Sequence, residues 1–536
     1  MKCLSIVLLS VALPCLHAQS VPLGFTVETL VANQHGPIAL DFLPDGRLLF
    51  CEQDTGDIKV LAGGAVATVG TVPGLRVSYS QGLLAMAVDP QWPTRPFLYC
   101  YHSSAAAQDL RITRFLVNGD LANATSTNLQ LGAAYVVLDG IPDTVPQHEG
   151  GGLRFGNDGT LFASFGDDRN ECLSQDLTRW NGKIVRLRVD ALPTGAGGPP
   201  PRASLVPAGN PYSGPGDIAQ LVWAHGLRNP FRFHIDPADG AIFVADVGEQ
   251  TFDEIDRIAV PGQNLGWPWR EGSAGYVGCG GVEPPSLAPI AEQPVPAVFL
   301  ALISLGVYRA SPSAPYRFGA SYDGDYFYTD HFSGRIWRLH RAGAGWSPAA
   351  PVPGQYSVEL WATGIAWITD ARVGPDGAFY FVERQHSGTG SVGRIRPTTA
   401  AFAAFGTGCL TGSPVLAAQT GQVPTLGQTF ALRIGQLPSA PGGLAIGMLG
   451  FSKSAWGTVA LPLSLAGYGM PGCTGLVAPD ITMLLANSGG VATWSLTLPN
   501  LPPLIGQDFY VQALALDPGR NAAGLVISNG GEGVMR

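Results

Sequence analysis

Charged side chains are scarce in this chain of 536 residues. Asp, Glu, Lys and Arg make up 13% of it, roughly half the share usual in soluble domains. The net charge is −9, and Lys and Arg form no run. Phosphate-backbone binding requires clustered basic side chains, so we expect no nucleic acid as a partner. Beyond the N-terminus no stretch is long and apolar enough to cross a bilayer, so we also expect no membrane span.

The N-terminus resembles an export signal rather than part of a fold. Residues 1–20 begin with a positive Lys2 and continue into an apolar run that is too short to cross a membrane. Leu16-His17-Ala18 ends in a small residue that suits cleavage. The sequence therefore predicts a signal peptide cleaved near Ala18 and a secreted or periplasmic protein.

Cysteine is infrequent, and no C-x-x-C motif occurs, so a zinc site is not expected. Two of the eight cysteines fall in the predicted signal peptide. An even number in an exported chain indicates disulfides, although six cysteines allow 15 connectivities. Proximity in sequence and position in the repeat described below favour three pairs, which are Cys51–Cys100, Cys172–Cys279 and Cys409–Cys473.

Glycine and proline, by contrast, are abundant, with 71 and 44 copies. This composition suits many strands joined by tight turns. One pattern recurs over residues 21–400: a turn, a short apolar strand, a polar tip and a strand that ends in Arg or Ile. Its turns are Asp45-Gly46, Asp89-Pro90, Asp158-Gly159, Asp239-Gly240, Asp323-Gly324 and Asp376-Gly377.

These repeats predict an all-β fold. An Asp-Gly pair is a hairpin signal, and strands apolar on both faces must be buried on both faces. A propeller blade packed between two others meets that requirement. Six copies therefore predict a six-bladed β-propeller over residues 21–400. The alternative is a tandem array of β-sandwiches, which does not place a polar residue at the same strand end each time.

Residues 401–536 differ in texture. Charge almost vanishes, and short apolar strands alternate with turns. The pattern predicts a small β-sandwich domain. No titratable cluster occurs there, which favours a structural, anchoring or glycan-contacting role over catalysis.

His148 is the first candidate for chemistry. It lies in the stretch Gln147–Gly152, whose glycines let the backbone approach a ligand closely. The stretch precedes a repeat turn, so we expect it at one mouth of the propeller channel. An imidazole there can accept a hydroxyl proton near neutral pH. The alternative is a histidine whose ring nitrogens are satisfied by backbone carbonyls.

Two further stretches carry ligand-binding groups. Arg228 and Asn229 combine a rigid cationic fork with an amide, which suits a planar ligand that bears carboxylates. The alternative is an arginine paired with an aspartate of a neighbouring blade. Residues 246–254 and 264–268 bring carboxylates and carbonyls close to glycines, as Ca²⁺ requires. The alternative there is a solvated acidic loop.

Three segments together resemble the quinoprotein glucose/sorbosone dehydrogenase family. HEGGGLRFGNDGTLFASFGDD is similar to its H-x-G-G…F-G-x-D-G-x-L-Y…G-D segment. HGLRNPFRFHIDPADGAIFVADVGEQTFDEIDRI with GQNLGWPWREG is similar to its G-L-R-N-P…G-x-N-Y-G-W-P segment. QGLLAMAVDPQWPTRPFLYCYHS resembles its G-L-L-G-x-A-x-D-P segment. The resemblance spans about residues 24–397 and implies a six-bladed propeller that holds pyrroloquinoline quinone and Ca²⁺ at the channel mouth.

The resemblance also assigns roles near the predicted base. His148 matches the general base that takes a sugar hydroxyl proton while hydride passes to the quinone. Arg228 and Asn229 match residues that hold the quinone. Gln147 and Asp168 match positions that line the substrate pocket.

Further positions match cofactor and metal ligands. Gln81 lies near a glutamine that contacts the quinone. The carbonyls of Gly248 and Glu249 match those that bind the Ca²⁺ of the cofactor. Glu254 and the carbonyl of Leu265 match ligands of a second, structural Ca²⁺.

The sequence departs from the family in its cations. Residues 364–370 read G-I-A-W-I-T-D and lack the two basic residues that usually precede the last turn. A lysine of the fifth blade has no counterpart unless Arg309 or Arg317 replaces it. Since the quinone is a tricarboxylate, these losses weaken its binding. The motif D-V-G-E…E-I-D-R-I is more similar to that of the family branch that contains hedgehog-interacting-protein-like propellers.

Three functions are therefore compatible with the sequence. The first is a quinone- and Ca²⁺-dependent dehydrogenase that oxidises a small sugar or polyol and passes electrons to an external acceptor. The second is a non-catalytic secreted propeller that binds a glycan or a protein at the channel mouth. The third is a lactonase-type hydrolase that uses acidic residues and one Ca²⁺.

Overall fold

The computed structural model describes residues 19–213, 216–295, 300–343, 345–410, 412–438, 444–501 and 504–536. Most of the predicted signal peptide, including its cleavage site, lies outside the described residues. The chain divides into two compact units, one of residues 27–396 and one of residues 397–536 together with 22–26. Within the described ranges, no helix has the length and apolar character needed to span a membrane.

Six antiparallel sheets, which we refer to as blades, form most of the first unit, and a short hairpin of β17 (Arg270–Glu271) and β18 (Ala274–Gly275) is added to them. Blade one contains β2 (Pro37–Phe42), β3 (Leu48–Glu52), β4 (Asp57–Ala62) and β5 (Ala65–Thr71). Blade two contains β6 (Leu83–Val88), β7 (Phe97–Ser103), β8 (Asp109–Gly119) and β9 (Leu129–Pro142). Blade three contains β10 (Leu153–Phe155), β11 (Leu161–Phe165), β12 (Lys183–Leu187) and β13 (Val222–His225).

The remaining blades follow in sequence. Blade four contains β14 (Pro230–Ile235), β15 (Ile242–Asp246), β16 (Phe252–Ile258) and β19 (Ala291–Pro294). Blade five contains β20 (Leu302–Val307), β21 (Tyr326–Asp330), β22 (Ile336–Ala342), β23 (Gly345–Pro348) and β24 (Leu360–Ala362). Blade six contains β25 (Ile368–Val373), β26 (Phe379–Arg384), β27 (Thr389–Pro397) and β1 (Phe25–His35).

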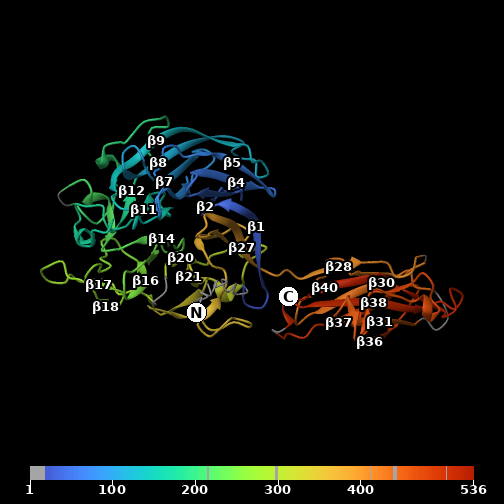
Figure 1. The fold of residues 1–536 in the computed structure, drawn as a ribbon. Helices are drawn as coiled ribbons and strands as arrows, with labels where there is room; N and C mark the ends of the chain where they lie inside the picture. Colours follow the sequence, from blue (N-terminus) through green and yellow to red (C-terminus); the bar gives the residue numbers. More distant parts are fainter. Residues whose placement is uncertain are drawn as a thin grey trace, which may run out of the picture. The chain divides into compact units, whose positions relative to one another are not determined.

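The blades close into a ring. The first strands β2, β6, β10, β14, β20 and β25 contact one another in this order, and β25 contacts β2 again. The N-terminal strand β1 completes blade six by pairing with β27, so both ends of the propeller sequence share one sheet (Figure 1). The predicted all-β propeller is confirmed.

The repeat turns have the predicted position. Each of the six joins the first strand of its blade to the second. Gly46 and Gly159 illustrate the reason for glycine, since their φ angles are +93° and +76°. Positive φ is easy for glycine and costly for residues with a Cβ atom.

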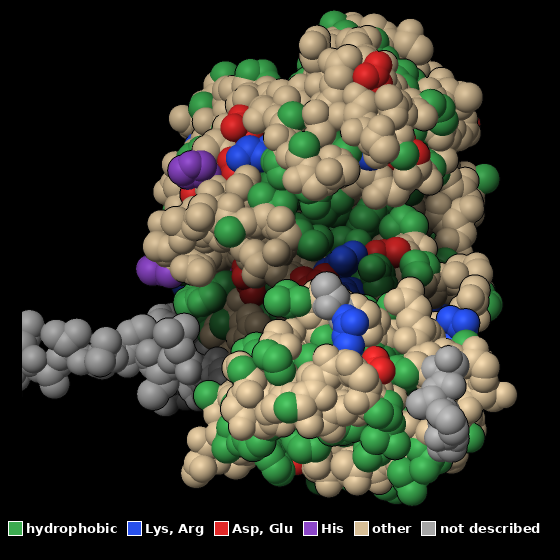
Figure 2. All heavy atoms as spheres, turned by 90° about the vertical axis from the view of Figure 1, so that its right-hand side faces the viewer, with side chains coloured by type: hydrophobic (Ala, Val, Ile, Leu, Met, Phe, Trp, Pro, Cys, Tyr) green, Lys and Arg blue, Asp and Glu red, His purple; other side chains and the backbone are tan. Residues whose placement is uncertain are grey.

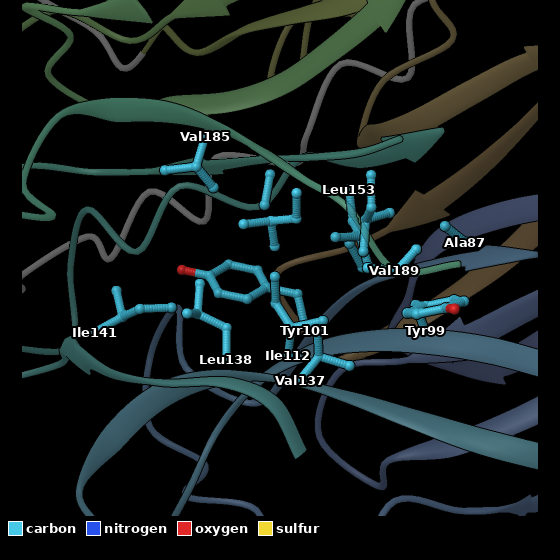
Figure 3. Close-up of a cluster of buried hydrophobic side chains, with 14 of the residues drawn as sticks. Ala87, Tyr99, Tyr101, Ile112, Val137, Leu138, Ile141, Leu153, Val185 and Val189 are labelled. Atoms are coloured by element: carbon cyan, nitrogen blue, oxygen red, sulfur yellow. The ribbon is translucent and has the colours of Figure 1, made fainter. Parts of the chain in front are cut away.

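Blade-to-blade packing buries both faces of the strands. All five residues of β3 and all six of β6 are buried. Between blades two and three, Tyr101, Leu138 and Ile141 face Leu153 and Val185 across an apolar layer (Figure 3). The surface reflects the low charge of the sequence, because few ionised side chains interrupt the uncharged ones on the face shown in Figure 2.

An ionic network fills the centre of the ring. Arg232 of β14 donates to the carbonyls of Ile38, Leu84, Gly151 and Thr369, which lie on or beside four other first strands. The network also contains an ion pair, in which Arg154 Nη2 on β10 lies 2.5 Å from Asp370 Oδ1 on β25. Burial alone would raise the pKa of Asp370. The charges of three nearby arginines, together with His234, lower it to about 2.

The second unit is a β-sandwich, as predicted. One sheet contains β28 (Ala401–Phe405), β40 (Gly530–Val534), β38 (Asp508–Leu516), β31 (Leu444–Gly450), β36 (Ile481–Ala486) and β39 (Leu525–Ile527). The other contains β29 (Val415–Ala418), β30 (Thr429–Gly435) and β37 (Ala492–Thr497). A large apolar cluster that includes Trp494 and Phe509 forms the main core of this unit, and a smaller one contains Leu476, Val477 and Tyr510.

Two of the three predicted disulfides form, namely Cys172–Cys279 and Cys409–Cys473. The prediction of Cys51–Cys100 is wrong, because both residues are buried free thiols on β3 and β7 of different blades. They pack as small apolar side chains in one hydrophobic cluster. Burial raises the pKa of Cys51 to about 12, so this thiol stays protonated.

Candidate functional site

The predicted site residues lie on loops at one edge of neighbouring blades. In an antiparallel pair, the first strand begins where the second strand ends. His148 precedes β10 and Asp167 follows β11, while Arg228 precedes β14 and Glu249 follows β15. The loops of blades three and four therefore meet at one mouth of the channel.

His148 is held by a buried carboxylate. Its Nδ1 lies 2.7 Å from Asp167 Oδ1, and its backbone has a φ of +63°. The Asp167 carboxylate also accepts the Arg169 N–H at 2.9 Å and the Trp267 indole N–H at 3.0 Å. Because these partners fix Asp167 as an acceptor, Nδ1 of His148 carries the proton and Nε2 is the basic nitrogen.

The surroundings keep this imidazole neutral. Burial lowers the pKa of His148 below its ordinary value of 6.5, and the nearby positive charge of Arg228 lowers it further. The hydrogen bond to Asp167 opposes both effects. At neutral pH the ring is therefore a free base rather than a cation.

The three glycines after Glu149 allow the loop to approach the ring centre. A Cβ atom on Gly152 would lie 2.2 Å from Phe233 Cδ1, and one on Gly150 would lie 2.5 Å from the Ser164 carbonyl oxygen. Gly150 also donates its N–H to Asn229 Oδ1 at 3.2 Å. This contact joins the His148 loop to the predicted cofactor loop.

Arg228 lies under the same mouth, with 7% of its side chain exposed. Its Nη1 donates to the Val247 carbonyl at 2.7 Å, Nη2 contacts Glu249 Oε2, and the guanidinium faces the Trp267 ring at 5.6 Å. Its buried Nε has no hydrogen-bond partner among the described residues. The backbone N–H groups of Arg228 and Asn229 both donate to the Asp246 carboxylate.

The loop after β15 is fixed by buried carboxylates. Glu271 accepts the N–H groups of Glu249, Gln250 and Thr251, and Asp253 accepts that of Gly248. A Cβ atom on Gly248 would overlap the Phe252 carbonyl oxygen at 2.0 Å, so only glycine fits there. The Glu249 side chain, however, extends to the two arginines Arg228 and Arg169.

The three remaining predicted pocket residues have different surroundings. Gln147 is half-buried beside His148. The Asp168 carboxylate accepts the N–H and the hydroxyl of Thr144, and so holds the loop that leads to His148. Gln81 is fully buried and donates to Asp143 Oδ1 at 2.7 Å, while its own Oε1 has no partner among the described residues.

The predicted second calcium site contains an unexpected carboxylate. Glu254 and Asp256 are both buried on β16, and both Asp256 oxygens have no hydrogen-bond partner in the described ranges. Burial raises the pKa of both groups, and neighbouring negative charge adds to it, from Asp256 on Glu254 and from Asp246 on Asp256. Leu265 is buried, with its N–H donating to the His225 carbonyl. Within the described part of the chain, no three His, Cys, Asp or Glu side chains converge on one point.

Arg309 and Arg317 do not replace the missing cations. Arg309 and Arg317 lie near the opposite edge of their blade, where they pair with Asp236 and Asp323. The last stretch instead places Trp367 next to the rings of His331 and Phe332. On the side of blades five and six the mouth therefore carries these three rings, with Arg384 at the end of β26 beside them and paired with Asp54.

Sequence reasoning missed Asp167, Trp267 and Glu271. The doublet Asp167-Asp168 signalled a carboxylate, but it did not show which one faces His148. Trp267 stands in the quoted G-W-P motif, and Glu271 in the R-E-G that follows it. Their contacts join segments that lie about a hundred and about twenty residues apart in sequence.

Comparisons with known proteins point to one family. The profile of the family described as Glucose / Sorbosone dehydrogenase matches residues 34–392. The aldose sugar dehydrogenase YliI of Escherichia coli is 26% identical over 272 residues, which cover 50% of this chain and 69% of that protein. HIPL1 protein of Arabidopsis thaliana is 34% identical over 143 residues, which are 25% of this chain and 20% of that protein.

A solved structure extends the comparison to the fold. The PQQ-bound aldose sugar dehydrogenase from Streptomyces coelicolor has a TM-score of 0.51 and 25% identity to this chain. The likeness covers 70% of this chain and 99% of that one. It is therefore confined to a part of the chain about as long as the propeller.

Proposed function

This chain belongs to the glucose/sorbosone dehydrogenase family, and we propose that it oxidises an aldose sugar or a related polyol with pyrroloquinoline quinone and Ca²⁺. In this proposal His148 is the general base, and an external acceptor reoxidises the cofactor. The predicted signal peptide and the two disulfides support an exported enzyme.

One observation carries the proposal. The His148 imidazole is neutral and oriented by Asp167, next to a buried guanidinium at the channel mouth. A base oriented by a carboxylate is the arrangement by which enzymes remove a hydroxyl proton. A histidine placed only for packing would not need Asp167 to be held in turn by Trp267 and the Arg169 N–H.

The residues fit a quinone carboxylate. The Nε of Arg228 is a buried donor with no partner among the described residues. Its Nη2 contacts the carboxylate of Glu249, which lies where a ligand carboxylate would bind. We expect Arg228 and Asn229 to hold the carboxylate and carbonyl oxygens of the cofactor. When bound, the quinone supplies the two-electron acceptor that receives hydride from the sugar carbon.

The residues also fit Ca²⁺. Two buried carboxylates side by side, one of them without hydrogen bonds among the described residues, are stable only when they are protonated or paired with a cation. We propose that Glu254 and Asp256 hold a structural Ca²⁺ with the Leu265 carbonyl, and that the carbonyls of Gly248 and Glu249 hold the one at the cofactor.

The chain's own part in the reaction is proton transfer and positioning. His148 Nε2 accepts the sugar hydroxyl proton, and Asp167 stabilises the imidazolium that forms. Gln147 and Asp168 shape the pocket beside it, and Gln81 supports the cofactor side. The loop of Glu249, fixed by Glu271, keeps its carbonyls in place.

The test is reconstitution of the mature protein with quinone and Ca²⁺, followed by dye reduction across a panel of sugars. We expect turnover, and a loss of more than a hundredfold in His148→Gln with the quinone still bound. His340→Gln, which changes an exposed histidine on β22, the third strand of blade five, should retain full activity. No turnover with any sugar, and no change in the quinone absorbance, would remove the proposal.

A second candidate is a non-catalytic propeller that binds a glycan at this mouth. The aromatic group of Trp367, His331 and Phe332, in place of the expected cations, favours it. Glycan binding that survives His148→Gln but is lost in Trp367→Ala, without any turnover, would support this function instead.

A further inference from the structure

We propose that Glu249 is a built-in counter-ion that determines which anions the cofactor site accepts. Its carboxylate is paired with the Arg228 guanidinium, which a ligand carboxylate would also need. A polycarboxylate therefore has to compete with Glu249 for this guanidinium. This inference rests on the proposed function and concerns the same site.

The contacts of Glu249 show the competition directly. Its Oε2 contacts Arg228 Nη2 and lies 3.1 Å from Arg169 Nη1, with Oε1 at 3.4 Å from the same nitrogen. Of the Arg228 nitrogens, Nη1 is already bonded to the Val247 carbonyl. Only Nε is left without a partner among the described residues, so a bidentate carboxylate that uses Nε and Nη2 must compete with Glu249 for Nη2.

Displacement requires only the side chain of Glu249 to move. Its backbone is fixed, since Glu271 accepts three consecutive N–H groups of this loop. The side chain is 25% exposed and Arg169 is 46% exposed, whereas Arg228 is nearly buried. The displaced carboxylate can therefore turn toward solvent and stay paired with Arg169.

The charges around Arg228 explain why the Glu249 carboxylate affects the binding of an anionic ligand. Arg228, Arg169 and Glu249 together carry a single positive charge, and the nearby carboxylate of Asp167 offsets part of it. In the last blade, residues 364–370 lack a basic side chain, and the cation at this edge, Arg384, is already paired with Asp54. A tricarboxylate is thus under-neutralised, and removal of the Glu249 charge should favour it.

The decisive measurement is quinone binding rather than activity. Calorimetric titration of the full-length protein with Ca²⁺ present would compare wild type with Glu249→Gln, which keeps size but removes charge. We expect about tenfold tighter binding of pyrroloquinoline quinone by the variant. The trimethyl ester of the quinone should show no such gain, because it carries no carboxylate.

Two further variants complete the design. Glu532→Gln removes a carboxylate of a surface ion pair in the second unit and should bind as wild type does. Arg169→Gln should bind the quinone several-fold more weakly, because one cation and the alternative partner of Glu249 are lost together. Arg169 is exposed, so this variant tests the inference even if Glu249→Gln does not fold.

The outcomes separate the two proposals. Equal quinone affinity of wild type and Glu249→Gln, with wild type binding tightly, overturns the role of Glu249 and leaves the dehydrogenase proposal standing. A gain that appears equally with the ester also overturns it. If neither protein binds the quinone, both proposals fail.

Discussion

At the residue scale, the two adjacent carboxylates Asp167 and Asp168 have different tasks. Asp167 faces His148 and Trp267, whereas Asp168 turns to Thr144 and fixes the preceding loop. The two residues that follow Asp167, Asp168 and Arg169, both have positive φ, which turns the chain sharply after β11. This turn presents one carboxylate to each side of the loop.

We expect Asp167→Asn to lower kcat by about 100- to 10,000-fold, because an amide can donate to Nδ1 and so favour the wrong imidazole tautomer. The measurement is steady-state dye reduction by the reconstituted enzyme. Asp176→Asn removes a more exposed carboxylate bonded to Thr178 and serves as the matched control. Unchanged kcat in Asp167→Asn would contradict the orienting role.

The pH profile should follow the imidazole of His148. Its pKa lies below 6.5 because of burial, so the proton is lost, and the base becomes competent, before neutral pH is reached. We expect kcat/KM to rise with pH and to level off with a midpoint below 6.5. A midpoint at or above 6.5 would show that another group limits the reaction.

At the element scale, the inner strands are joined by charge as well as by apolar packing. Arg232 is fully buried and bonds carbonyls on or beside four other inner strands. Burial lowers its pKa to about 10, and the Asp370 carboxylate opposes that effect. One side chain thus satisfies acceptors that a closed ring would otherwise leave without donors.

Arg232→Met should destabilise the propeller by about 3–5 kcal/mol, since the carbonyls and Asp370 would lose their buried partner. The transition of the propeller in thermal unfolding should fall accordingly. Arg257→Met, which removes a partly exposed ion pair with Asp239, should cost at most about 1 kcal/mol. Equal effects of the two variants would refute a special role for the network.

At the scale of the whole molecule, each unit has its own core and its own disulfide. Cys172–Cys279 closes a separation of 107 residues in the propeller, and Cys409–Cys473 closes 64 residues in the sandwich. A cross-link over a loop of this length constrains the unfolded chain by about 4–5 kcal/mol in the entropic description.

Calorimetry should therefore resolve two unfolding transitions. Cys172→Ser with Cys279→Ser should lower only the propeller transition, by about 4 kcal/mol in stability. Cys409→Ser with Cys473→Ser should lower only the other. A single transition shifted by both pairs would show that the units unfold together.

The sequence by itself determined the strand pattern and the six turns, and it selected His148, Arg228 and Asn229 as candidates, because hairpin chemistry and short motifs are local in the chain. Only the tertiary structure decided that Asp167 rather than Asp168 orients His148, that Glu249 is paired with Arg228, and that Cys51 and Cys100 stay reduced. These outcomes depend on which way a side chain points and on which blades meet. Such contacts arise only when distant segments pack together, so the chain's local pattern contains no signal for them.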